Sequence, residues 1–91
     1  SIKEKVAAFN KSVKIAPNPS NGIFSIRFDI PNVTVNSIII YNLLGESIYQ
    51  NSNINNSKEQ SINLSHLSEG TYFATIKTSK GNSTKKIVIT K

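Results

Sequence analysis

The stretch "LSEGTYFATIK", residues 67–77, alternates apolar and polar side chains behind a glycine. Tyr72, Ala74 and Ile76 would share one face of an extended strand, because successive side chains of a strand point to opposite faces. A tyrosine just after Gly70 is typical of a tyrosine corner, in which the hydroxyl bonds to backbone a few residues upstream. The stretch therefore predicts one strand of an antiparallel β-sandwich, buried on the face that carries the tyrosine.

The rest of the chain repeats this period of two between short polar connections. Apolar residues alternate or cluster in six further runs that we expect to be strands: 13–15, 24–30, 38–41, 48–49, 62–64 and 85–91. Asn and Ser make up 25 of the 91 residues, which favours turns and exposed strand faces over helices. Seven short strands without a long helix predict an all-β fold, an immunoglobulin-like antiparallel β-sandwich of about seven strands.

Two polar stretches are expected to connect strands. "QNSNINNSKEQ", residues 50–60, should form a mobile loop, and "KGNS", residues 80–83, should form a turn before the last strand. Residues 1–11 are interpreted as a linker or lead-in from a larger protein, and residues 12–91 as one domain. The chain has no cysteine, but 91 residues are enough to bury roughly 60% of the unfolded surface without disulfides.

A stiff corner precedes the second expected strand, in "KIAPNPSNGIF", residues 14–24. Pro17 and Pro19 fix the backbone φ angle and lack amide donors, so the segment around them cannot be a helix or a central strand. Gly22 and the asparagine before it supply a turn. We expect this corner to set the angle at which the next strand starts.

The chain is basic, with 11 Lys and Arg against 5 Asp and Glu and a formal net charge of +6. Ten of these cations are lysines scattered along the chain, and Arg27 is the one arginine. Nucleic-acid sites usually cluster arginines or place aromatic side chains among basic ones, so we expect no nucleic-acid partner. The longest apolar run, within residues 37–41, is far too short to span a membrane.

Candidate catalytic and metal-binding residues are few. His66 is the only histidine, and its serine neighbours are expected by chance in a serine-rich chain. The five carboxylates are dispersed, so no spacing indicates a metal site or a pair of catalytic acids. We therefore expect no enzyme activity, no metal ion and no cofactor.

Sugar binding is an alternative function for a sandwich of this kind. Tyr41, Tyr49 and Phe73 could stack on a sugar ring if they formed an exposed row, although the chain has no tryptophan. Cross-strand packing on a half-buried sheet explains the same aromatic residues. The alternative function is that of an immunoglobulin-like adhesion or carbohydrate-binding module of a secreted protein.

The last run, "KKIVITK" at residues 85–91, combines lysines with β-branched residues. Lys85, Ile87, Ile89 and Lys91 would point to one face of a strand. As an edge strand, its lysines would discourage aggregation with other sheets. A basic, apolar strand could instead serve as a handle for another protein.

Four stretches, in this order, resemble the C-terminal sorting domains of type IX secretion cargo from Bacteroidota: "APNPSNGIFSI" (16–26), "IIIYNLLGESIY" (38–49), "INLSHLSEGTYFATI" (62–76) and "KKIVITK" (85–91). The first is similar to the opening of that family, with Pro-Asn-Pro, a polar pair and glycine. Ala16 departs from the family, which usually has tyrosine there. The resemblance covers residues 12–91.

This resemblance implies a secretion signal, not a catalyst. The domain would direct a cargo protein through the outer-membrane type IX translocon, and a sortase-like protease would then cleave it off. The cargo would be released or attached to the cell surface after transit through the periplasm. We expect the domain to be a monomer or a weak dimer.

The resemblance also implies roles for particular residues. The residues expected to hold the shape are Pro17, Asn18, Pro19, Gly22, Gly45, Gly70 and Tyr72. The residues expected to form a recognition strand are Lys85, Lys86, Ile87, Val88, Ile89 and Lys91. This strand could pair by its edge with a sheet of the partner.

Overall fold

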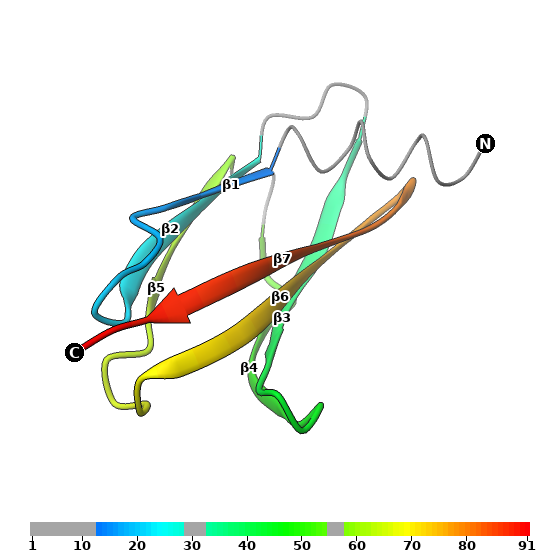
Figure 1. Ribbon diagram of the computed structural model, residues 1–91. Coiled ribbons are helices and arrows are strands. Elements are labelled where there is room, and N and C mark those ends of the chain that lie inside the picture. The colour runs from blue at the N-terminus through cyan, green and yellow to red at the C-terminus, as the bar shows by residue number, and fades with distance from the viewer. Residues whose placement is uncertain (1–12, 29–32, 55–57) are drawn as a thin grey trace.

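The structure is a computed structural model of the chain, and it describes residues 13–28, 33–54 and 58–91. The regular secondary structure within these residues consists of β-strands (Figure 1). The strands are β1 (Val13–Ala16), β2 (Ile23–Phe28), β3 (Val35–Tyr41), β4 (Ser47–Asn51), β5 (Glu59–Asn63), β6 (Gly70–Thr78) and β7 (Gly81–Ile89). A search of the described residues finds no helix with the length and apolar character needed to cross a membrane.

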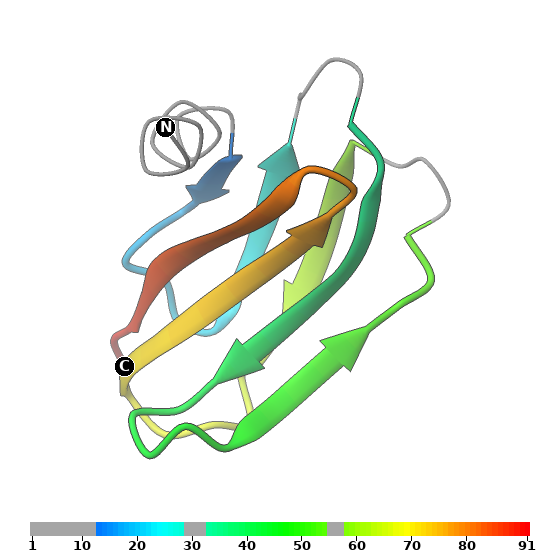
Figure 2. The same ribbon diagram turned by 90° about the vertical axis from the view of Figure 1, so that its right-hand side faces the viewer.

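The strands form two antiparallel sheets. One sheet has the order β1-β2-β5, and the other has the order β4-β3-β6-β7. The sheets lie face to face as two layers, as the two views show (Figures 1 and 2). The predicted all-β antiparallel sandwich of seven strands is therefore confirmed.

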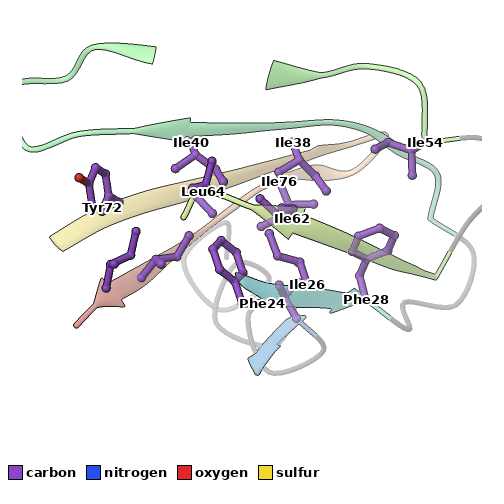
Figure 3. Close-up of a cluster of buried hydrophobic side chains, with 14 residues drawn as sticks. Phe24, Ile26, Phe28, Ile38, Ile40, Ile54, Ile62, Leu64, Tyr72 and Ile76 are labelled. Carbon is purple, nitrogen blue, oxygen red and sulfur yellow. The ribbon is translucent and has the colours of Figure 1, made fainter. Parts of the chain in front are cut away.

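The hydrophobic core lies between the two sheets (Figure 3). Tyr72, Ala74 and Ile76 of β6 are buried in it, as the alternation of their stretch predicts. Phe24 and Ile26 of β2 face them from the other sheet. Burying one large apolar side chain of this kind contributes about 1.5–3 kcal/mol, so the alternating runs supply the main stabilisation of the sandwich.

The predicted tyrosine corner is present. The hydroxyl of Tyr72 donates a hydrogen bond to the carbonyl oxygen of Ser68 at 2.8 Å, four residues upstream. The ring is almost fully buried in the core, so this hydroxyl needs a partner. The bond holds the connection between β5 and β6 against the start of β6.

The last strand begins earlier than the sequence predicts. β7 starts at Gly81, where residues 80–83 were expected to form a turn, and the reversal occurs at residues 79–80. The hydroxyl of Thr78 stabilises this shorter turn by donating to the carbonyl of Gly81 at 2.6 Å and accepting from the amide of Lys80 at 3.1 Å. Because β7 begins with polar residues, apolar alternation does not indicate this part of the strand, even though Ser83 is fully buried.

Parts of the polar stretch 50–60, which was predicted to be a mobile loop, belong to strands and to the core. Asn51 ends β4, and β5 begins at Glu59. Between them Ile54 is only 3% exposed, and its side chain belongs to the core cluster (Figure 3). Residues 55–57 lie outside the described residues, as do the predicted lead-in 1–11 and the end of the predicted strand at 29–30.

Candidate functional site at the C-terminal end of the sandwich

Parts of all four motif stretches meet at one end of the sandwich, which we call the C-terminal end. It consists of the β1–β2 connection at 17–22, the β3–β4 hairpin at 42–46, the β5–β6 loop at 64–69 and the last residues, 90–91 (Figure 1). Antiparallel pairing produces this grouping, because β2 and β6 start where β5 and β7 end. Val13, the first described residue, lies at the opposite end.

The Pro-Asn-Pro-Ser segment binds along the outer edge of β7. The side-chain amide of Asn18 donates to the carbonyl of Lys86 at 2.9 Å, and its oxygen accepts from the amide of Val88 at 3.0 Å. The backbone amide of Ser20 donates to the carbonyl of Val88 at 3.0 Å, and the carbonyl of Ser20 accepts from the amide of Thr90 at 2.8 Å. These four bonds form a clamp, which we name the Asn18–Ser20 clamp.

The clamp explains why prolines flank Asn18. β7 is an edge strand of its sheet, so its outward amides and carbonyls have no neighbouring strand among the described ones. Pro17 and Pro19 have no amide hydrogens to donate, and the bonds that the corner donates to β7 come from the Asn18 side chain and the Ser20 amide. Both prolines follow cis peptide bonds and are exposed.

The six residues predicted to form the recognition strand divide into two groups. Ile87 and Ile89 are buried in the core and hold β7 in place. Lys86 and Lys91 are exposed, while Lys85 and Val88 are half-buried. Edge pairing of a partner along residues 86–90 would require the clamp to leave, because its four bonds occupy the backbone groups on that side. The role of these six residues stays a prediction.

Gly22, Ser65 and Lys91 bring three of the motif stretches into contact. The carbonyl of Gly22 accepts from the amide of Leu64 at 2.7 Å, and the carbonyl of Ser65 accepts from the Nζ of Lys91 at 2.6 Å. A Cβ atom on Gly22 would lie 2.7 Å from the Cα of Ser65, and the φ angle of Gly22 is +115°. Only glycine fits this approach, which gives the predicted shape role of Gly22 a steric reason.

The β3–β4 hairpin is organised by Asn42. Its side-chain oxygen accepts from the amides of Leu44 at 2.9 Å and Glu46 at 3.0 Å, and its side-chain nitrogen donates to the Glu46 carboxylate at 2.9 Å. The backbone amide of Asn42 donates to the carbonyl of Glu46, and the backbone carbonyl of Asn42 accepts from the amide of Gly45. Gly45 has a φ angle of +84°, which glycine adopts without strain, so its expected role in holding the shape has a conformational reason.

The residues considered for sugar binding do not form an exposed row. Tyr41 and Phe73 are cross-strand partners and both are half-buried. Tyr49 instead pairs with the buried Ile40 and packs against the core. His66 is exposed in the β5–β6 loop, and among the described residues no three His, Asp or Glu side chains gather as metal ligands.

Sequence reasoning missed three participants at this end: Ser20, Asn42 and Ser65. Ser20 binds β7 and Ser65 binds Lys91 through backbone groups, which any residue type can supply, although the hydroxyl of Ser20 also accepts from the amide of Gly22 at 3.1 Å. Asn42 could have been found, because an asparagine followed by a short segment and a glycine is typical of a turn closed by the asparagine side chain.

A family model for secretion system C-terminal sorting domains matches residues 14–90. The chain belongs to this family. A comparison with curated proteins gives no match. The matched range runs from β1 through β7 and includes the Asn18–Ser20 clamp, so the family covers the whole described sandwich apart from its first and last residues.

The sorting domain is therefore the C-terminal signal of a type IX secretion cargo protein. Such a signal acts by interacting with the type IX secretion machinery, and it directs its cargo to the cell surface or the extracellular space. The resemblance seen in the four stretches is confirmed by the family match.

Proposed function

We propose that the sorting domain folds in the periplasm and is recognised there, through its C-terminal end, by the outer-membrane translocon. A sortase-like protease then cuts upstream of the domain, and the cargo is released or attached to the surface. The domain itself performs no reaction and needs no cofactor.

One observation carries this proposal: parts of all four motif stretches meet at the C-terminal end, while the first described strand, β1, begins at Val13 at the other end. The cargo of a C-terminal sorting domain precedes it in the chain. Recognition at the far end would therefore leave room for cargo of any size, which suits a signal that serves unrelated proteins.

The proposed contacts are the side chains of Lys86 and Val88 on β7, beside this end, and of Lys91, within it. Lys86 and Val88 lie on the outer face of the sheet, and Lys91 lies where the strand ends. Ile87 and Ile89 are buried, so they support recognition by keeping the strand in its sheet. A folded domain would thus present two cations beside one half-buried apolar side chain.

Export of a reporter tests the proposal. Residues 1–91 would be attached to a periplasmic fluorescent protein in a host with type IX secretion and in its translocon mutant. We expect the reporter in the medium or on the surface of the first strain only. Folded, intact reporter trapped in the periplasm of both strains would overturn the proposal.

Charge reversal then tests the contacts without removing core residues. The double variant Lys86→Glu/Lys91→Glu should reduce export, because Lys91 lies at the C-terminal end and Lys86 is exposed on β7 three residues before the strand ends. Lys77→Glu/Lys80→Glu makes the same charge change at the opposite end of the sheet, where both lysines are exposed, and should leave export unchanged. Equal export of the two variants would remove Lys86 and Lys91 from the recognition site.

A further inference from the structure

The β3–β4 hairpin displays two leucines to solvent. Leu43 is 69% exposed and Leu44 is 85% exposed. Ile23 is the one other large apolar side chain that is exposed in the described residues, and it lies on the three-stranded sheet. Exposed leucines at a hairpin tip contribute nothing to the core, and the polar residues that usually form turns would serve the backbone equally well.

The hairpin holds these leucines in a defined place. Five hydrogen bonds run through Asn42, three from its side chain and two from its backbone. An apolar pair on such a prearranged turn loses little conformational freedom when a partner covers it, which favours binding.

The surface beside the leucines supplies a charged border. An open hollow of about 280 Å³ lies between the hairpin and the start of β6, and Leu43, Leu44 and Glu69 all line it. Glu46 follows the leucines on the hairpin itself and is exposed. Two of the five carboxylates of a chain with net charge +6 thus lie next to the most exposed apolar pair of the described residues.

We propose that this leucine hairpin docks into an apolar recess with a basic rim on a protein of the secretion machinery. The inference rests on the proposed function and adds a second contact at the C-terminal end, separate from Lys86 and Lys91. The leucines would fill the recess, and Glu46 and Glu69 would face the basic rim. A protein is favoured over a membrane because an anionic lipid surface would repel these carboxylates.

Paired variants in the reporter export assay test the docking surface. Leu43→Ser/Leu44→Ser should lower the export rate at least about tenfold, because a partner would no longer bury two leucine side chains. Ile23→Ser, the matched control on the other sheet, should export at the rate of the unchanged domain. Thermal unfolding of each purified domain shows whether folding is intact, and Leu44→Ser alone provides a second variant at the more exposed position.

Neutralising the carboxylates tests the basic rim. Glu46→Gln/Glu69→Gln should lower export several-fold while both leucines remain in place. Export of the leucine variants at the unchanged rate would overturn the docking surface and leave the proposed function intact. Failure of the unchanged domain to export its reporter would overturn the proposed function and this inference with it.

Vesicle binding distinguishes a protein from a lipid partner. The purified domain should not sediment with phosphatidylcholine vesicles or with vesicles that also contain phosphatidylglycerol. Binding to either vesicle that disappears in Leu43→Ser/Leu44→Ser would overturn the inference in favour of a membrane contact.

Discussion

The side chain of Asn18 spans two backbone groups of β7, accepting from the amide of Val88 at 3.0 Å and donating to the carbonyl of Lys86 at 2.9 Å. This contact joins segments near the two ends of the described chain, since Asn18 and Val88 are 70 positions apart in the sequence. An asparagine side chain can do this since its amide carries a donor and an acceptor in one plane, as a peptide bond does. Asn18 thus takes the place of a neighbouring strand for part of the β7 edge.

Replacing Asn18 should loosen the C-terminal strand. Asn18→Ala removes both side-chain bonds, although water can reach the exposed backbone, so we expect a loss of about 1 kcal/mol in the free energy of unfolding. Asn82→Ala, at an exposed position near the start of the same strand, should change stability by less than about 0.5 kcal/mol. Urea unfolding followed by circular dichroism measures both, and equal losses would show that the clamp is energetically unimportant.

Gly22 should tolerate no side chain. Gly22→Ala places a Cβ 2.7 Å from the Cα of Ser65 in a left-handed backbone conformation, so we expect a loss of about 3 kcal/mol. Gly81→Ala is the matched control, because its φ angle of +124° is similar but no atom lies within 4 Å of the added Cβ. The control should lose only about 1–2 kcal/mol, from the backbone alone. Similar losses in the two variants would argue against the close approach to Ser65.

The tyrosine corner can be tested by removing one atom. Tyr72→Phe keeps the buried ring but deletes the hydroxyl that donates to Ser68 at 2.8 Å. The variant should be about 1 kcal/mol less stable, because the lost bond anchors the β5–β6 loop. Amide hydrogen exchange should rise in residues 64–69. Unchanged exchange in that loop would mean that packing of the ring alone holds it.

Ile54 should behave as a core residue despite its polar surroundings in the sequence. Ile54→Ala should destabilise the domain by about 2–4 kcal/mol, since the side chain is 3% exposed. Ile23→Ala, at a position that is 51% exposed, should cost less than about 1 kcal/mol. Thermal unfolding compares the two variants, and a small loss at Ile54 would restore the prediction of a loose loop.

Most of the fold could be predicted from local patterns. The period of two in residues such as Tyr72, Ala74 and Ile76 indicates strands with one buried face, and short polar connections imply antiparallel pairing. The spacing of Gly70 and Tyr72 is enough to indicate the tyrosine corner. The errors fell at strand ends and connections: β7 begins with polar residues, and Ile54 is a lone apolar residue in a polar stretch.

The candidate site could be predicted only in part. The motif residues Asn18, Gly22 and Gly45 were singled out, but their contacts were not. Asn18 binds a strand 70 residues away, and Gly22 is required because of Ser65, which is 43 positions further along the chain. No local rule specifies such partners, since they depend on how the two sheets stack.

The sequence by itself determined the class of this protein: alternating apolar residues make strands, the prolines stop them, and four ordered motifs indicate a secretion signal. Only the tertiary structure decided that these motifs share one end of the sandwich, that the Pro-Asn-Pro-Ser corner occupies the β7 edge, and that Leu43 and Leu44 remain exposed. The physical reason is that the two kinds of interaction act over different separations along the chain. Side-chain periodicity and turn chemistry act over a few residues, whereas edge pairing and burial depend on segments that meet only after the sheets have packed.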